Sequence, residues 1–332
     1  MPEGWYYACP SRDLRPGPVP VELGDKRFVA FLYAAGHTAV LDARCSHMGA
    51  DLSRGDVTGG RLRCPLHAWE YAADGQCVRI PATSEIPRFA CQPAYPTAEV
   101  GGHVVFYSAP SARFPFPFYE GRSPADLLAA APFDFVVNTP WYLIGANAFD
   151  LQHFRVAHDR TLADAPVIDE PSPFARRITA NYDVSGTSVR DRLTRRFSGP
   201  RVRMSVTVWG GTLILVSAEF RRTTSYGMVF VRPLEAARTH LRTIVWVPRR
   251  RGPLRRALVD PLDALVRRSF IRAFMTDDAV RSDGVGYNPH TLIDADRELR
   301  DYFAWLARLT TEAGRSQPCP QPPRPGDDTS SR

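Results

Sequence analysis

The chain has 332 residues, of which 44% are hydrophobic and 23% charged. This length favours two domains or one large one, and the composition excludes a chain that is disordered throughout. The formal net charge of +7 comes almost entirely from arginine, with Lys26 as the only lysine, and no nucleic-acid-binding motif accompanies it. A mildly basic surface predicts an acidic partner protein more than a nucleic acid.

The N-terminus lacks the charged start and apolar run of a secretory signal, and no apolar segment approaches the ~18 residues of a membrane span. We therefore expect a cytoplasmic protein. The arginine-rich residues 249–258 could touch an anionic membrane surface, but a solvated helix face is the favoured interpretation.

The first third of the chain, residues 1–112, reads as short strands of aromatic and β-branched residues separated by Gly-containing breaks. This pattern predicts a small all-β domain. The expected strands include Arg27–Ala34, His37–Ala43, Arg61–Cys64 and His103–Ser108.

A proline-rich segment follows. Alternating prolines exclude a helix interior at Phe114–Phe118, so we expect an interdomain linker there. A short helix is predicted at Pro124–Ala131, with Ser123 as N-cap and proline at the first helical position.

The rest of the chain predicts a second domain over residues 113–316. Residues 145–160 look helical, and residues 174–248 contain long alternating segments that fit an antiparallel sheet with one buried face. Amphipathic helices are expected at 254–276 and 295–309. The Pro-, Ser- and Asp-rich residues 317–332 predict a disordered tail. The strands expected here include Arg201–Trp209, Thr212–Phe220 and His240–Val247.

Two Cys/His pairs stand out in the first domain. Six cysteines in a chain of this length without a signal peptide indicate metal binding more than a disulfide framework. Two tight loops that each carry one thiolate and one imidazole can hold a binuclear iron–sulfur cluster, with both cysteines on one iron and both histidines on the other. A structural zinc site is the alternative, although its usual spacings place like ligands together. The four candidate ligands are Cys45, His47, Cys64 and His67.

A second constellation lies at residues 147–158. Asp150 and His153 would share a helix face, whereas His158 lies five residues beyond His153, so a bent or broken helix would be needed to bring both imidazoles to one ion. A carboxylate would complete a facial triad for non-haem iron, and the acidic pair Asp277 and Asp278 offers one. The alternative is that Thr276 and this pair simply start a helix.

Together these motifs resemble those of Rieske non-haem iron oxygenases. The phrases Cys45–Gly55 and Arg63–Trp69 strongly resemble the Rieske motif, with Ala68 where that family usually has glycine. The matching segments are residues 5–7, 23–31, 41–50, 76–81 and 86–87, and they look most like the single-subunit group of ketosteroid 9α-hydroxylases and cholesterol 7-desaturases. The resemblance implies an α+β chain: an N-terminal all-β Rieske domain, then a helix-grip domain with an antiparallel sheet around a long helix.

The resemblance also implies roles for the second constellation. It makes His153, His158 and Asp278 the ligands of a mononuclear iron, and Asp150 a carboxylate that bridges to the cluster of a neighbouring subunit. Asn147 would be a hydrogen-bonding residue beside the iron site.

The resemblance further implies a terminal oxygenase with a [2Fe–2S] cluster and Fe(II) that hydroxylates or desaturates a hydrophobic ring substrate with O₂, and that forms a head-to-tail homotrimer. Because the chain has no Gly-x-Gly-x-x-Gly fingerprint, a separate NAD(P)H-dependent reductase is implied, with or without a ferredoxin. Aromatic-ring dioxygenation and O- or N-demethylation stay open. A non-catalytic electron carrier is a third possibility, but it would end near residue 112.

Overall fold

The computed structural model describes residues 1–34 and 36–311. They divide by their contacts into two compact units, residues 8–112 and residues 1–7 with 113–311. The predicted tail at 317–332 lies outside the described residues. Within those residues no helix combines the length and apolarity needed to cross a membrane.

The unit of residues 8–112 consists of small sheets and two single-turn 3₁₀ helices. Its sheets have the orders β1-β11-β10, β2-β3-β4-β9 and β5-β6-β7-β8, and the division between the units falls within β1, after Tyr7. The predicted all-β character is therefore confirmed. The elements are β1 (Trp5–Pro10), η1 (Ser11–Leu14), β2 (Val19–Leu23), β3 (Lys26–Ala34), β4 (His37–Asp42), η2 (Leu52–Arg54), β5 (Asp56–Thr58), β6 (Arg61–Arg63), β7 (Glu70–Tyr71), β8 (Cys77–Arg79), β9 (Ala94–Tyr95), β10 (Thr97–Val100) and β11 (His103–Tyr107).

The four strands predicted in this unit are confirmed as β3, β4, β6 and β11, each within one residue at either end. Of these, β3, β4 and β11 are easy to recognise because consecutive apolar residues in them are buried on both faces. Val29, Phe31 and Leu41 are fully buried in one core cluster, which also contains Cys45 and Cys64. The metal-binding loops thus start from a rigid core.

The other unit is built on a nine-stranded sheet with the main order β12-β20-β19-β18-β17-β16-β14. Neighbouring strands on this path are antiparallel, and β13 and β15 pair with β20 and β16. The strands are β12 (Leu127–Ala129), β13 (Phe133–Val137), β14 (Arg160–Leu162), β15 (Val167–Ser172), β16 (Ala175–Val184), β17 (Arg201–Trp209), β18 (Leu213–Phe220), β19 (Thr224–Glu235) and β20 (Arg238–Pro248).

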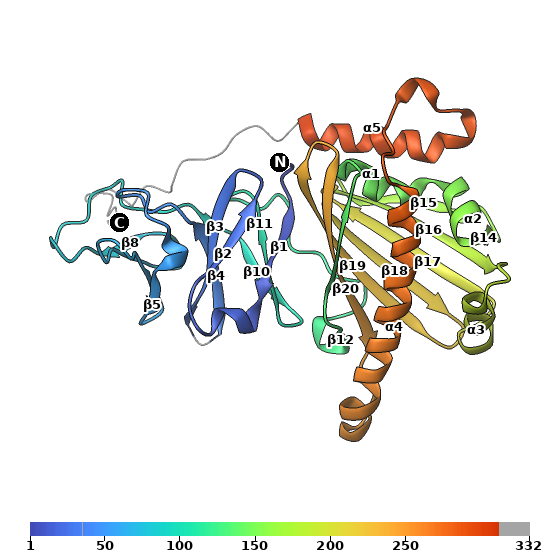
Figure 1. Cartoon of the computed structure of the whole chain (residues 1–332), viewed down its shortest axis with the longest axis horizontal. Coiled ribbons are helices and arrows are strands. Elements are labelled where there is room, and N and C mark those ends of the chain that lie inside the picture. Colours follow the sequence, from blue (N-terminus) through green and yellow to red (C-terminus); the bar gives the residue numbers. More distant parts are fainter. Residues whose placement is uncertain (35, 312–332) are drawn as a thin grey trace, which may run out of the picture. The chain divides into compact units, whose positions relative to one another are not determined.

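The long helix α4 (Pro253–Arg281) runs along this sheet, and α5 (Arg297–Thr311) packs with α1 in the core (Figure 1). The predicted arrangement of an antiparallel sheet around a long helix is confirmed, as are the three long strands expected in this unit. The other helical segments are η3 (Pro124–Asp126), α1 (Trp141–Ala146), η4 (Asn147–Phe149), α2 (Leu151–His158), α3 (Val189–Phe197), η5 (Pro289–Thr291) and η6 (Asp294–Asp296).

The amphipathic helices expected at 254–276 and 295–309 are confirmed as α4 and α5, and the structure differs from the sequence interpretation at three other points. The helix predicted at Pro124–Ala131 is a single turn, η3, because the following residues pair with β20 as strand β12. Ser123 does cap that turn. Thr276 does not start a helix, since α4 continues to Arg281. The alternating pattern of residues 174–248 also hid helix α3.

The segment Phe114–Phe118, predicted as a linker, has no helix or strand. Phe114 is nevertheless buried and stacks on Phe174. This stretch is therefore part of the packing of the second unit rather than a loose tether.

Candidate functional site

The two Cys/His loops of the first unit share one backbone pattern. In each, the amide of the cysteine donates to the carbonyl five residues later, over 2.9 Å from Cys45 to Ala50 and 2.8 Å from Cys64 to Trp69. The carbonyl of each cysteine also accepts from the residue four positions on. Two equivalent tight turns therefore present equivalent side chains.

The four candidate ligands differ in solvent exposure according to their residue type. Cys45 and Cys64 are buried, whereas His47 and His67 are exposed. The Nδ1 atoms of the two imidazoles lie 3.1 Å apart, and Trp69 stacks on His47 with ring centroids 4.5 Å apart. Two thiols inside and two convergent imidazoles outside fit a binuclear cluster with two sulfur and two nitrogen ligands.

Hydroxyl groups surround the inner side of this site. The Tyr71 hydroxyl lies 3.1 Å from Cys45 Sγ and 3.0 Å from Ser46 Oγ. Burial, and then the contact with Cys45, raises the pKa of Tyr71, so this phenol stays protonated. Burial also raises the pKa of the Cys64 thiol. A protonated phenol next to a thiol can donate to its sulfur once the thiol becomes a metal-bound thiolate.

The second constellation is carried by helix α2. Asp150 is its N-cap and accepts a hydrogen bond of 2.9 Å from the amide of His153. The helical structure is interrupted at Asp150, before the two histidines, and His153 and His158 both lie in α2. His158 is its last residue, and Asp159 follows in the left-handed conformation. A break between the two histidines is therefore not needed.

Both imidazoles converge on one carboxylate oxygen from α4. Asp278 Oδ1 lies 3.0 Å from His153 Nε2 and 2.7 Å from His158 Nε2. Burial alone would raise the pKa of Asp278, but hydrogen bonds from the two histidines outweigh it and lower the pKa. Asp277, the other candidate, instead forms an ion pair of 2.9 Å with Arg190. The structure thus brings Asp278 to the histidines.

These three residues suit a metal ion by their chemistry. Two imidazole nitrogens and one carboxylate oxygen, all within 4.8 Å of one another, form the donor set of a facial triad. His158 Nδ1 is buried and has no hydrogen-bond partner in the described structure. Of the other predicted residues, Asn147 lines the main cavity, whereas Asp150 lies with His153 at a separate, shallower hollow.

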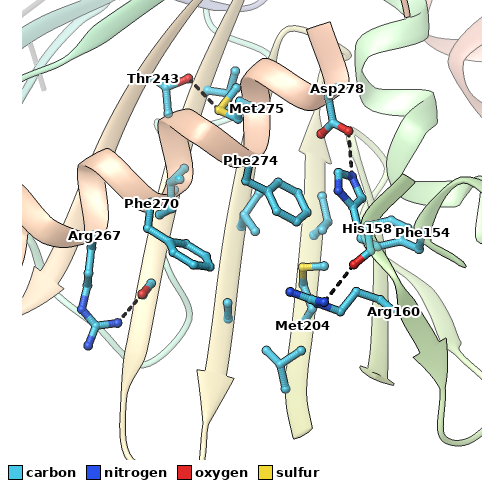
Figure 2. Close-up of a pocket in the computed structure, with 18 of the residues that line it drawn as sticks. Phe154, His158, Arg160, Met204, Thr243, Arg267, Phe270, Phe274, Met275 and Asp278 are labelled. Carbon is cyan, nitrogen blue, oxygen red and sulfur yellow. Dashed lines mark hydrogen bonds and ion pairs between the residues drawn. The ribbon is translucent and has the colours of Figure 1, made fainter. Parts of the chain in front are cut away.

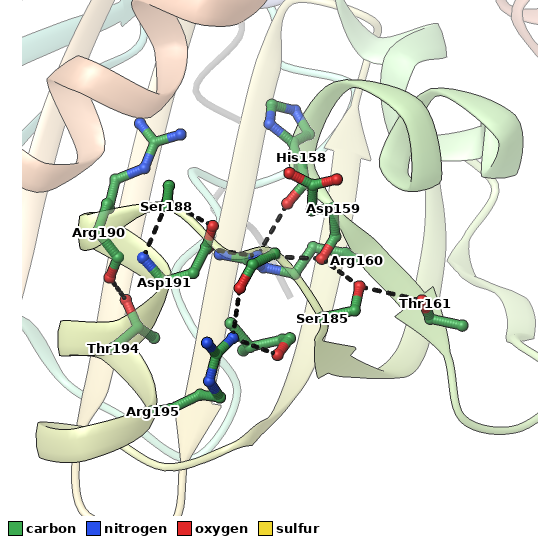
Figure 3. A network of polar contacts seen from close by, with 12 residues as sticks. His158, Asp159, Arg160, Thr161, Ser185, Ser188, Arg190, Asp191, Thr194 and Arg195 are labelled. Carbon is green, nitrogen blue, oxygen red and sulfur yellow. Dashed lines mark hydrogen bonds and ion pairs between the residues drawn. The ribbon is translucent and has the colours of Figure 1, made fainter.

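Neighbouring side chains hold His158 in place. Phe274 stacks on its imidazole with ring centroids 3.8 Å apart. Arg160 donates to the His158 carbonyl over 2.8 Å and forms a buried ion pair of 2.8 Å with Asp191 (Figure 3). Asp191 also accepts from Ser188 at the start of α3. Charged side chains from two segments therefore fix the end of α2.

A cavity of about 830 Å³ lies between α4 and the sheet and reaches the metal-site residues. Its inner wall is mainly aliphatic and aromatic, with Phe270 and Phe274 on the helix side (Figure 2). An apolar molecule can therefore be buried beside His158. Side chains that line this part include Val206, Ile214, Val229, Leu241, Phe274 and Met275.

Several of these residues were missed by sequence reasoning. Arg160 and Asp191 are 31 residues apart, and neither belongs to a recognisable motif. Phe274 and the aliphatic lining follow the ordinary period of buried helices and strands, so their pattern does not separate cavity from core. Tyr71 had a weak signal, as an aromatic residue soon after the second loop.

Comparisons with known proteins agree with this geometry. Residues 4–90 match the family described as Rieske [2Fe-2S] domain. The chain is 36% identical over 166 residues to aminopyrrolnitrin oxygenase PrnD of Pseudomonas fluorescens, covering 46% of this chain and 45% of that protein. It is 36% identical over 113 residues to the oxygenase component of 3-ketosteroid-9-alpha-monooxygenase from Rhodococcus rhodochrous, covering 34% and 29%. The matched segments thus span less than half of these curated relatives.

Solved structures match over more of the chain. Dicamba monooxygenase bound to dicamba covers 93% of this chain and 97% of its own, with a TM-score of 0.69 at 16% identity. A mutant of NdmA from Pseudomonas putida CBB5 with caffeine covers 92% and 90%, with a TM-score of 0.68 at 19% identity.

The class of protein follows from these findings: the chain has the fold of Rieske oxygenases. More particularly, residues 4–90 are a Rieske [2Fe–2S] domain, and the relatives by sequence are oxygenases and desaturases with ring substrates in their names. The family match supports the iron–sulfur interpretation of the first constellation over the zinc alternative.

Proposed function

We propose that this protein is a terminal oxygenase in which Cys45, His47, Cys64 and His67 hold a [2Fe–2S] cluster, and His153, His158 and Asp278 hold a mononuclear iron. The observation that carries the proposal is the convergence of two imidazole nitrogens on one Asp278 oxygen at the wall of an apolar cavity. A bare electron carrier would have no use for such a site. When bound, the two metal groups supply one-electron chemistry and the activation of O₂.

The side chains of this unit would position the substrate and exclude solvent. The stacked Phe274 restrains the imidazole of His158, and the Arg160–Asp191 pair holds the backbone of that residue. The apolar wall favours a hydrophobic ring substrate, in line with the steroid and cholesterol names of two relatives. Hydroxylation or desaturation is the first expectation, with ring dioxygenation and demethylation as alternatives. Labelled O₂ would separate them by counting the oxygen atoms in the product.

The electrons would come from a separate reductase, with or without a ferredoxin. His47 and His67 are exposed, so a partner can approach the nitrogen-ligated side of the cluster. We further propose a homotrimer in which Asp150 of one copy contacts a cluster histidine of the next. Asp150 is placed for such a role because it lies beside His153 and is not fully buried.

The test of the proposed function is a metal analysis combined with spectroscopy. Purified protein should contain about three irons and two inorganic sulfides per chain, and reduction should give the EPR signal of a Rieske cluster. Replacing both His153 and His158 by Ala should remove about one iron and all product formation, but leave the EPR signal. Zinc in place of iron, or unchanged iron and product in the double variant, would refute the proposal.

A further inference from the structure

The main cavity changes character along β19. Thr223, just before this strand, and Ser225, Gly227 and Val229 within it all line the cavity, because alternate residues of a strand point to the same face. Two hydroxyl groups therefore lie at one end of this row, and an apolar side chain lies at the other. Along this row the cavity is polar at the Thr223 end and apolar at the Val229 end.

Helix α4 has the same order of polar and then apolar residues, and its row continues to the metal site. Arg267, Phe270, Phe274 and Asp278 follow one another at helical spacing along the cavity (Figure 2). Arg267 donates to the Ser225 hydroxyl, which joins the polar end of the helix row to the polar end of the strand row. The metal-site residue Asp278 stands at the opposite end, beyond the two phenylalanines.

One hydroxyl at the polar end is unsatisfied. Thr223 Oγ1 is buried and has no hydrogen-bond partner in the described part of the chain. An unpaired buried hydroxyl is costly, and such groups usually have a ligand or water as partner. Thr223 lines the cavity, and rotation about its χ1 exchanges Oγ1 with the methyl group on the same Cβ, so the hydroxyl can turn to donate one hydrogen bond to an acceptor atom inside the cavity.

The distance between the polar end of the cavity and the metal site can be estimated from the lengths of α4 and β19. Eleven residues of helix from Arg267 to Asp278 correspond to about 16 Å. The strand gives a consistent length: Ser225 to Val229 spans about 13 Å. Val229 pairs with Thr243, which contacts Met275, and Arg267 to Met275 is about 12 Å of helix. A molecule that reaches both ends must be elongated.

The charges at the polar end are balanced. Arg267 pairs with Asp263 over 2.7 Å, and Asp263 also pairs with Arg250 over 3.0 Å. Arg250 pairs in turn with the fully buried Asp260. With two positive and two negative groups, this end offers hydrogen bonds but no uncompensated charge for an anion.

We propose that the cavity binds an elongated, apolar molecule that carries one uncharged oxygen acceptor, such as a ketone, at the end remote from Asp278. The hydroxyl groups of Thr223 and Ser225 form the subsite for that oxygen, and Arg267, held by Asp263, orients the Ser225 hydroxyl. This inference rests on the proposed function, since it names the class of substrate that the oxygenase would hold with its apolar body towards the metal site.

The test compares three probes of nearly equal shape by calorimetry on the full-length, iron-loaded protein. They are 4-acetylbiphenyl, 4-isopropenylbiphenyl, in which a methylene replaces the ketone oxygen, and biphenyl-4-carboxylate. We expect the ketone to bind about tenfold more tightly than the isopropenyl probe, as one or two hydrogen bonds would give. The carboxylate should bind more weakly than the ketone because of its desolvation cost.

Variants then locate the subsite. In Thr223→Val combined with Ser225→Ala, the tenfold preference should fall to about one, with the affinity for the isopropenyl probe unchanged. Thr223→Val alone keeps the shape of the side chain and should lower the preference severalfold. Thr224→Val is the matched control, because Thr224 is the intervening residue of the row and does not line the cavity; it should keep the full preference.

Several results would overturn the inference: no ketone preference in the unaltered protein, a preference that survives in the double variant, tightest binding of the carboxylate, or no binding of any biphenyl. Calorimetry needs no turnover. The iron content and the EPR signal of the same preparations therefore test the proposed function, and the calorimetry tests the subsite separately.

Discussion

Ala68 occupies in the second Cys/His loop the backbone position that Gly49 occupies in the first. Each lies four residues after its cysteine and donates its amide to the carbonyl of that cysteine, and each has a left-handed φ, +54° for Ala68 and +71° for Gly49. A Cβ atom in this conformation costs about 1–2 kcal/mol. The departure from glycine noted in the sequence is thus a strained position, while the cysteine and histidine side chains keep their places.

Replacing Ala68 by Gly should therefore stabilise the Rieske domain. The relief of backbone strain exceeds the entropy that glycine adds to the unfolded chain, for a net gain of about 0.5–1 kcal/mol. The melting temperature of the cluster absorbance should rise by about 2–5 °C. Gly49→Ala is the matched control and should lower it, since nothing near Gly49 obstructs a methyl group and only the backbone cost remains. A fall in the Ala68→Gly variant would contradict the strain.

The Tyr71 hydroxyl should tune the cluster. A hydrogen bond to a ligating sulfur stabilises the reduced form, which carries more negative charge. Tyr71→Phe should lower the reduction potential by about 60 mV, which corresponds to roughly 1.4 kcal/mol for one electron. Protein-film voltammetry would measure it. Tyr95→Phe, which removes another buried hydroxyl of the same unit, should leave the potential unchanged.

The acidic pair on α4 provides a test of the iron ligand. Asp278→Asn should remove about one iron per chain and abolish product formation, because a neutral amide is a much poorer ligand than a carboxylate. Asp277→Asn breaks only the ion pair with Arg190 and should retain the iron. Iron analysis and product assays on the two variants decide between them. The reverse pattern would move the ligand to Asp277.

Asp150 can be tested without disturbing its helix, because Asn is an equally good N-cap. Asp150→Asn should keep the iron content and the melting temperature. If Asp150 couples cluster and iron between subunits, the oxidation of the reduced cluster in a single turnover should slow at least tenfold. Stopped-flow spectroscopy would follow that step, and an unchanged rate would exclude the coupling role.

The Arg160–Asp191 pair predicts a pH-dependent stability. Burial alone would raise the pKa of Asp191, but hydrogen bonds from Ser188 and Arg160 and the charge of Arg160 lower it. Because the folded-state pKa lies below that of the unfolded chain, the stabilisation is present above about pH 4 and is lost as the pH falls through the folded value.

Asp191→Asn should accordingly cost about 3 kcal/mol at pH 7, since it leaves Arg160 buried without its counter-charge. Urea unfolding should be measured at pH 7, at pH 5, at pH 4 and below pH 4. The difference in the free energy of unfolding between the variant and the unaltered protein should shrink only under about pH 4. A difference that is constant over this whole range would mean that the charge of Asp191 has no part in it.

The sequence determined the local features of this protein. The apolar runs of β3 and β4 and the alternation of β17 were readable because strand periodicity is imposed by immediate neighbours. The Cys/His loops were readable for a similar reason, since each pair of candidate ligands lies within four residues on one turn. The order of an all-β domain followed by a sheet with a long helix followed from these elements.

Only the tertiary structure decided what long-range contacts create. Asp278 meets His153 across 125 residues, and no local spacing distinguishes it from Asp277. The single turn at Pro124 ends early because the residues that follow it pair with β20. The cavity lies between α4 and the sheet, and the helical period of its lining residues predicts only that they are buried, not that they face a cavity. These features depend on which surfaces pack together. The free energy of that packing is summed over segments far apart in the chain, so a local sequence pattern does not reveal it.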